Sequence, residues 1–385
     1  MAIQSAFTLT ANEIFTTLAN MIISQEVFAN NLGKHQTLVD KARVDGGLYG
    51  DTKLYYATDV LKSEEWGNDA EATNLLALDR PADPSVQAIK LDKFRQIRLT
   101  VDNYLTKRGF ATEGAFSSFN SVMLGWMRET KKVYDGTLYN TFIGTTETSV
   151  GKQQVTIDLD ADSNSAGENI ARAMADLFTD MEDYNRSYND YGYLRSYDKS
   201  EIKIVWNAKY VNAVKKIDLP SIFHNEALVS VFDGDVLAPR YFGTVITASN
   251  ISTYSASTPT TGKPIDSDDG AYTPGTNHAN GCLRATIEKE VTVSATVYHV
   301  FPGDEIPAGA TVKASDGNFG YGEVYIEKDD VICKVLTKLP PYMSAFEVGT
   351  TFFNPRSLTE NHYITWGQNS LAYLKNYPLI TVKAV

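Results

Sequence analysis

The stretch from residue 112 to about residue 142 constrains the fold more than any other part of the chain. Bulky, mostly apolar side chains recur there at spacings of three and four residues, which predicts one continuous amphipathic helix. The predicted stripe consists of Phe116, Phe119, Met123, Trp126, Thr130, Val133, Tyr134, Leu138 and Phe142. About 30 residues at a rise of roughly 1.5 Å span about 45 Å, and a single helix of that length usually lies across a sheet. We therefore expect an α+β protein.

A long strand is predicted over residues 88–103, before this helix. Ile97, Leu99 and Val101 alternate with polar residues, as in a strand with one buried face. Charged side chains interrupt the alternation closer to the start of the strand. The outer half of the strand is therefore expected to project from the body of the protein.

Two segments before this strand have no obvious place in a compact core. Residues 45–88 carry glycine and proline at their ends and few apolar residues between them, so we interpret them as a long functional loop. At the N-terminus, Thr10 and Glu13 form a capping box ahead of an amphipathic helical stripe. The stripe consists of Ile14, Leu18, Met21 and Ile22. A lone helix of this kind is expected to act as an arm.

The rest of the chain predicts an α/β unit, a β-rich segment and a final group of strands. The α/β unit has strands at 153–160, 201–206 and 242–247 and helices after Ser165 and at 209–216. The first of these helices has an apolar stripe of Ile170, Met174, Leu177 and Met181. Five tyrosines lie between residues 184 and 197, which fits a partner surface or a half-buried loop equally well.

Residues 251–281 are rich in Ser, Thr, Gly, Pro and Asp, so they are expected to form a mobile exposed loop. Residues 283–336 then read as β structure throughout, which predicts an inserted β-rich lobe. Further strands are expected near the end of the chain, at 346–353, 363–366 and 379–382.

Composition excludes several classes of protein. The 385 residues are 43% hydrophobic and 21% charged, which is ordinary globular composition. No stretch is apolar enough for a transmembrane helix, and the N-terminus is not expected to be a signal peptide. The net charge of −12 disfavours a dedicated nucleic-acid reader. The densest cationic group, Arg128, Lys131 and Lys132 beside Glu129, is predicted to be a solvated helix face.

No motif indicates a catalytic, cofactor or metal site. Residues 144–152 lack the spacing and the Ser or Thr of a phosphate loop. Asp158, Asp160 and Asp162 lack the Gly and Glu of a calcium loop, so a solvated turn is favoured. Cys282 and Cys333 are predicted to be unpaired thiols rather than one disulfide. His224 and His362 lie near Glu226 and Glu360, but adjacent polar residues are common in loops, so neither is assigned a catalytic role.

The order of these elements resembles the major capsid protein of tailed bacteriophages, a fold shared with encapsulins. The resemblance rests on the early TANEIFTTLANMIISQEVFANNL helix, the long EGAFSSFNSVMLGWMRETKKVYDGTLYNTFIG helix, EIKIVWNAKYVNAVKK and the closing strands. It implies an N-terminal arm at 1–44, an extended loop at 45–108, a peripheral domain with a spine helix at 109–150 and 337–385, an α/β axial domain at 151–250, and an inserted loop and β-rich lobe at 251–336.

The resemblance implies a virion protein that assembles with itself into pentamers and hexamers of an icosahedral shell around a phage DNA genome. Scaffold, portal and decoration proteins are further implied partners, assembly is implied to take place in the host cytoplasm, and packaged DNA is met only by non-specific proximity. The extended loop would lie over a neighbouring subunit. The candidate contact residues are Lys93, Arg95, Arg98, Glu64, Glu65, Asp69, Tyr55 and Trp66.

Three alternatives stay open at this point. An encapsulin-like nanocompartment shell would have the same fold and a protein cargo, although the inserted lobe favours a virion. An enzyme with a β accessory domain and an unrecognised site would be a small discrete oligomer. A phage tail or adhesin component is favoured only by the β-rich segment and disfavoured by the long helices.

Overall fold

The computed structural model describes residues 38–45, 52–63, 80–102, 113–148, 150–160, 166–215, 234–251 and 282–385. The chain divides into two compact units, each assembled from three separate stretches. Unit 1 consists of Met1–Asp51, Lys90–Thr137 and Tyr342–Ser370, and unit 2 of Thr52–Ile89, Leu138–Pro341 and Leu371–Val385. The predicted arm helix, the loop at 252–281, Asp162 and His224 lie outside the described residues.

Unit 1 is built on long antiparallel strands. A five-stranded sheet has the order β1-β13-β14-β3-β2. Its strands are β1 (Arg43–Asp45), β13 (Tyr342–Asn354), β14 (Thr359–Asn369), β3 (Ser85–Asp102) and β2 (Thr52–Ala57). The short helix α2 (Leu38–Ala42) precedes β1, which pairs in parallel with the first residues of β13. β2 and the start of β3 belong to unit 2.

Strand β3 confirms the prediction made for residues 88–103. Val101 is buried and Ile97 and Leu99 are half-buried, while the residues between them are exposed. Beyond these bounds the strand is longer than predicted, because it begins at Ser85 and pairs with β14 from Leu91 to Asp102. The pairing places the apolar side of β3 on the same face of the sheet as Ile364 and Trp366 of β14.

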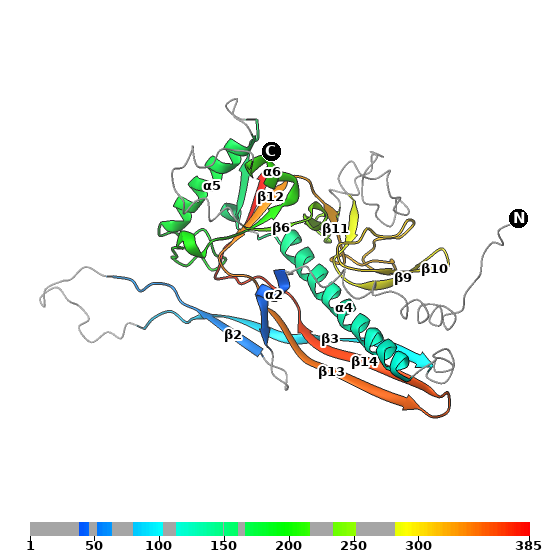
Figure 1. Cartoon of the computed structure of the whole chain (residues 1–385). Helices are drawn as coiled ribbons and strands as arrows, with labels where there is room; N and C mark the ends of the chain where they lie inside the picture. Colours follow the sequence, from blue (N-terminus) through cyan, green and yellow to red (C-terminus); the bar gives the residue numbers. More distant parts are fainter. Residues whose placement is uncertain are drawn as a thin grey trace, which may run out of the picture. The chain divides into compact units, whose positions relative to one another are not determined.

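Helix α4 (Glu113–Thr145) confirms the predicted long helix, and Figure 1 draws it as one unbroken element. The face that it buries in unit 1 differs from the predicted stripe. Trp126, Thr130 and Val133 are only half-buried, whereas Met127 and Lys131 are buried. The side chains of 113–124 lie outside the described residues. The apolar pattern misplaced this face because polar side chains occupy part of it.

A buried charge cluster explains why Lys131 is not on a solvated face. Its exposure is 4%, which corrects that prediction, whereas Arg128 is exposed as expected. The Lys131 ammonium donates to the Asp135 carboxylate at 3.0 Å and lies 5.5 Å from the ring centroid of Trp366. Asp135, at 1% exposure, also accepts from Arg43 of β1 at 3.3 Å and from the Tyr342 hydroxyl at 2.6 Å. Several donors around one carboxylate make the burial of these charges tolerable.

Unit 2 has a second five-stranded sheet, of order β4-β15-β12-β5-β6. Its strands are β4 (Gln154–Ile157), β15 (Leu379–Ala384), β12 (Val331–Leu336), β5 (Lys203–Asn207) and β6 (Asp235–Leu237). The helices of this part are α5 (Ala166–Glu182) and α6 (Ala208–Lys215), with 3-10 turns η1 (Gly151–Gln153), η3 (Lys199–Glu201) and η4 (Pro239–Tyr241). The predicted stripe of α5 is confirmed, because all four of its residues are buried in one core with Trp206 and Val335.

Strand membership in this sheet differs from the expected segment boundaries. The expected boundaries put β12 in the inserted lobe and β15 in the peripheral segment, but both strands pair within the sheet that β4 and β5 form. All six residues of β12 are buried, as suits a strand covered on both faces. A continuous apolar run predicts a buried strand but does not show which sheet the strand joins. The sequence alone could therefore not assign β12 to this sheet.

The remaining strands of unit 2 form a lobe with a core of its own. One sheet has the order β7-β11-β8, with β7 (Gly243–Val245), β11 (Val324–Glu327) and β8 (Leu283–Ala285). A hairpin joins β9 (Lys289–Val293) to β10 (Thr296–Val300). The predicted β character of residues 283–336 is confirmed in part, because β8 to β12 lie there but residues 301–323 between β10 and β11 contain turns and isolated bridges instead of a strand. Cys282 and Cys333 form no disulfide, as predicted, and no described helix is long and apolar enough to cross a membrane.

Candidate assembly site at the base of the extended loop

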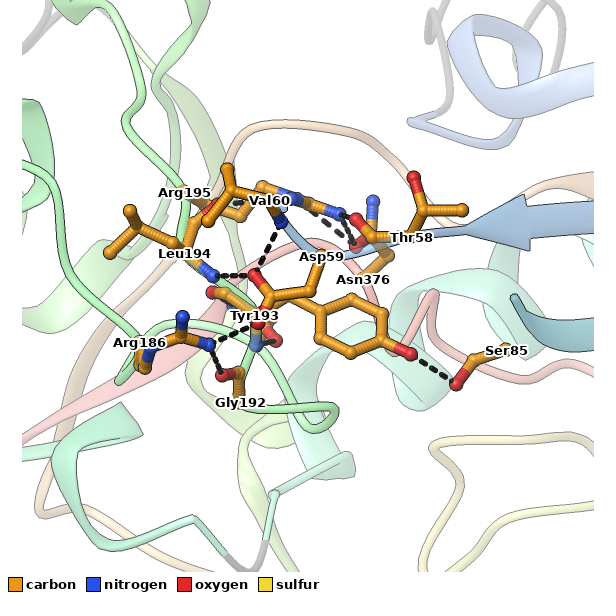
Figure 2. A network of polar contacts seen from close by, with 11 residues as sticks. Thr58, Asp59, Val60, Ser85, Arg186, Gly192, Tyr193, Leu194, Arg195 and Asn376 are labelled. Carbon is orange, nitrogen blue, oxygen red and sulfur yellow. Dashed lines mark hydrogen bonds and ion pairs between the residues drawn. The ribbon is translucent and has the colours of Figure 1, made fainter. Parts of the chain in front are cut away.

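The two limbs of the extended loop leave unit 2 side by side. The first limb is β2 with residues 58–63, and the second is residues 80–84 with the start of β3, which neighbours β2 in the sheet. Both limbs contact Asn185–Arg195, which we call the clasp (Figure 2). Residues 64–79, which join the limbs, lie outside the described residues.

The clasp is held in shape by its own hydrogen bonds. Asn185 and Arg195 exchange backbone hydrogen bonds of 3.0 and 2.9 Å, which close the segment at its ends. Inside it, the buried Asn189 side chain donates to the Tyr193 carbonyl at 2.7 Å and accepts from the Tyr193 amide at 2.9 Å. Gly192 has a φ of +67°, which favours glycine at this turn. These internal hydrogen bonds hold the clasp in the shape that contacts the limbs.

The first limb is held through Asp59. Its carboxylate accepts hydrogen bonds from the Arg186 guanidinium, from the Leu194 amide at 3.0 Å and from its neighbour Val60 at 2.9 Å (Figure 2). These donors favour the ionised form, and the Arg186 side chain above all lowers the pKa of Asp59 to about 2. The Arg195 guanidinium donates to the Thr58 carbonyl at 2.7 Å, so two arginines of the clasp hold this limb.

Low pH is expected to loosen this contact. The folded-state pKa of Asp59 lies below its ordinary value, so its ionised carboxylate stabilises the contact between the first limb and the clasp. This stabilisation is complete above pH ~4 and is lost as the pH falls towards about 2. Hydrogen exchange at the Leu194 amide, corrected for intrinsic rates, should accelerate across this window. The Asp59→Asn variant should exchange faster than wild type at pH 6, where the native carboxylate is fully ionised. Equal exchange of the two proteins at pH 6 would contradict this assignment.

The second limb is held by neutral hydrogen bonds. The Ser85 hydroxyl lies 2.6 Å from the Tyr193 hydroxyl, on the side of the clasp drawn at the right of Figure 2. Gln87 donates to the Tyr373 carbonyl at 2.8 Å and accepts from the Lys375 amide at 3.0 Å. The C-terminal stretch is tied in as well, because Arg195 donates to the Asn376 side chain at 3.0 Å. Arg195 therefore joins the first limb, the clasp and the C-terminal stretch.

The ribbon formed by the limbs has an apolar outer face. Leu54, Tyr56 and Val86 are 49%, 64% and 49% exposed, and they alternate with residues whose side chains face the body of unit 2. Tyr55 is one of these inward residues, with the Lys338 ammonium 5.7 Å from its ring centroid. Apolar side chains on the free face of a two-stranded ribbon are typical of a surface that another chain covers.

The candidate contact residues are distributed over both units. Lys93 and Arg98 are exposed on β3 in unit 1, while Arg95 is half-buried with its guanidinium 4.5 Å from the ring centroid of Tyr134. Tyr55 lies at the loop base. Glu64, Glu65, Trp66 and Asp69 lie outside the described residues.

Sequence reasoning missed the residues that hold the loop, namely Asp59, Arg186 and Arg195. The cluster of tyrosines between 184 and 197 was the available signal, and it left open a partner surface or a half-buried loop. Tyr188 and Tyr197 are buried, Tyr193 bonds the loop, and Tyr184 is 74% exposed. The segment is thus mostly an internal contact surface.

The described side chains offer no alternative centre for metal chemistry. No group of three or more potential metal-ligating residues occurs among them. His362 is buried, with its Nδ1 atom 3.2 Å from the Thr351 hydroxyl.

Comparison with known proteins agrees with this architecture. The model of the family described as Phi29-like phage major capsid protein matches residues 2–378. A capsid chain of Staphylococcus phage Andhra is similar in structure, with a TM-score of 0.60 and 11% identity over 94% of this chain and 88% of that one. A chain in the structure of the head fiber and inner core protein gp22 of native bacteriophage P68 has a TM-score of 0.57 and 13% identity, over 89% and 83% of the two chains. At such identities these two structures establish the fold alone. No curated protein sequence matches the chain.

Proposed function

The chain belongs to the family of Phi29-like phage major capsid proteins, and on that premise we propose that its clasped extended loop joins neighbouring copies in the shell. Membership makes the chain a structural protein that assembles with itself into a phage capsid and is part of the virion. It agrees with the capsid interpretation of the sequence and not with the encapsulin-like or enzyme alternatives.

The observation that carries the proposal is the clasp at the loop base. A projecting loop can bind a neighbour at a defined angle only if its base is fixed, because otherwise the ordering of the loop opposes association. Asp59 and Ser85 fix one limb each. The apolar outer faces of the limbs then provide contact area, and the exposed cations Lys93 and Arg98 on β3 can meet acidic groups on another copy.

The proposal extends to the roles of the domains. We assign the sheet of unit 1 and the long helix α4, whose last residues belong to unit 2, to the peripheral domain. We assign the sheet of β4, β15, β12, β5 and β6 with α5 to the axial domain. The axial domain would surround the symmetry axes of pentamers and hexamers. The shell would be icosahedral, would be assembled in the host cytoplasm with scaffold, portal and decoration proteins as partners, and would enclose a DNA genome. The net charge of −12 suits an inner wall that does not retain that genome.

Removal of the loop tip tests the proposal. Replacing residues 64–79 with a short Gly-Ser linker should abolish shell formation, because the contact with the neighbour is lost while the clasp stays intact. Negative-stain electron microscopy and light scattering report on shells. Circular dichroism and hydrogen exchange at Leu194 report on the fold and on the clasp.

A Gly-Ser linker of the same length as the deleted segment is the matched control, since it keeps the reach of the loop and removes its side chains. The variant with this full-length linker should also fail to form shells, because it lacks the side chains that would contact the neighbouring copy. Normal shells from the shortened protein would overturn the proposal.

A further inference from the structure

The hairpin of β9 and β10 is the most exposed described part of the lobe. Its loop consists of Ser294 and Ala295, with φ angles of 49° and 67°, as a type I′ turn requires. Val291, Val293 and Val300 are buried in the core of the lobe, so the hairpin is fixed at its base. Four of the five residues of β10 are nevertheless exposed, including Val297 at 58% and Tyr298 at 40%.

Strand β10 is an edge that lacks the usual protection. Among the described residues, its sheet contains only β9 and β10, so one side of β10 has no strand beside it. Natural edge strands are commonly protected by charged residues, proline or bulges. The sequence of β10 is Thr-Val-Tyr-His-Val, which contains no Lys, Arg, Asp or Glu and no proline. Its pairing with β9 is regular, so β10 has no bulge either. Such an edge is suited to pairing with a further strand.

The hairpin register determines which backbone groups face the open side. Val293 and Thr296 flank the two-residue loop and form a hydrogen-bonded pair, and hydrogen-bonded pairs then alternate along the ladder. The backbone groups of Tyr298 are therefore directed towards Val291 of β9. Those of Val297 and His299 are directed outward, where a second strand can reach them.

We propose that β10 pairs antiparallel with β10 of a second copy, with Tyr298 opposite the partner's Tyr298. This register places Val297 opposite the partner's His299, so the outward backbone groups of both strands meet and can exchange hydrogen bonds. Val291 and Tyr298 lie opposite each other on one face of the hairpin. In the proposed pairing, the same two residues of the partner would lie beside them on that face, which would extend the apolar core of the lobe. The four side chains together would cover the exposed area of Tyr298.

A second copy fits this edge better than a different protein does. The inference relies on shell formation, which brings many identical copies into fixed, repeated contacts. Pairing of identical strands about a twofold axis requires that they do not repel each other, and β10 has no Lys, Arg, Asp or Glu. Its one titratable imidazole, His299, already lies 2.7 Å from Glu288 of its own chain.

Cysteine crosslinking in the full chain tests the register. In the proposed pairing, Tyr298 and the partner's Tyr298 form a non-hydrogen-bonded pair with a Cα separation of about 4.5 Å, which suits a disulfide. Under a mild oxidant, shells of Tyr298→Cys should yield a covalent dimer on a non-reducing gel. Val297→Cys is the matched control, because it faces the partner's His299, and it should yield little dimer unless mixed with His299→Cys. The unchanged protein gives the background from Cys282 and Cys333.

Each outcome decides one question. Shells of Tyr298→Cys that yield no dimer overturn the pairing and leave the capsid function untouched. Equal dimer from Val297→Cys and Tyr298→Cys overturns the proposed register. Dimer from Tyr298→Cys in a preparation that forms no shells supports the pairing and counts against the shell function. The absence of both shells and dimer counts against both.

Discussion

Replacing Asp135 with alanine is expected to lower the free energy of unfolding by about 3–5 kcal/mol, because a buried ammonium loses its carboxylate. Lys131 is 4% exposed and lies 3.0 Å from Asp135, so water cannot solvate the ammonium well without local rearrangement. The Tyr342 hydroxyl, buried in the same cluster, loses the nearer of its two acceptors and keeps only the Gln368 side-chain oxygen at 3.1 Å. Urea denaturation of the unassembled chain, followed by tryptophan fluorescence, measures the effect.

Two comparisons separate the charge from ordinary packing. Arg128→Ala, on the exposed face of the same helix, should change stability by less than about 0.5 kcal/mol. The double variant Lys131→Met with Asp135→Leu should recover much of the lost stability, because apolar residues can replace a buried ion pair. A loss below about 1 kcal/mol for Asp135→Ala would show that the cluster is not desolvated as described.

Replacing Gly144 with alanine is expected to destabilise unit 2 by about 3 kcal/mol, at the upper end of overpacking effects. A Cβ atom at Gly144 would lie 2.0 Å from the Tyr241 carbonyl oxygen, and backbone cannot move aside as a flexible side chain can. Tyr241 ends the η4 turn and is itself buried. The close approach of α4 to this turn therefore requires glycine.

Gly125 provides the matched control on the same helix. A Cβ atom there would meet nothing within 4 Å, so Gly125→Ala should gain up to about 1 kcal/mol from helix propensity alone. Thermal or urea unfolding of both variants measures the contrast. Destabilisation by Gly125→Ala, or no effect of Gly144→Ala, would contradict the packing described for α4.

Long periodic elements were predictable because their pattern repeats many times. The alternation around Ile97 and the stripe of α5 each follow from one buried face, and the structure confirms both. The buried face of α4 was not predictable in the same way. Lys131 and Asp135 are four residues apart and could equally form an exposed ion pair on a helix. Their burial becomes evident only in the folded structure, where other parts of the chain cover both side chains. Lys334 gives a similar case, since it is 0% exposed and donates to the Thr381 hydroxyl at 2.8 Å.

The loop itself was predictable, but the contacts that fix it were not. Residues 45–88 are predicted to form a loop because their apolar residues show no helical or strand periodicity. The same absence of a pattern gives no information about which distant segment the loop contacts. Asp59 and Arg186 are 127 positions apart, and the same Arg186 guanidinium nitrogen also donates to the Gly192 carbonyl at 2.9 Å in the turn of the clasp. The order of the strands in the two sheets has the same origin, because long-range pairing is decided by tertiary packing and not by local pattern.

The interleaving of the two units has a consequence for synthesis on the ribosome. β15 lies between β4 and β12, and β13 and β14 lie between β1 and β3, although each of these three strands is made after residue 341. Neither five-stranded sheet can therefore close while the chain is still being translated through its first 341 residues. A nascent chain that has been translated only to residue 341 consequently lacks both finished five-stranded sheets, whereas all the strands of the lobe, β7 to β11, have already been made. Strand order alone therefore delays the two large sheets, and the contacts that depend on them, until the last strands have been made.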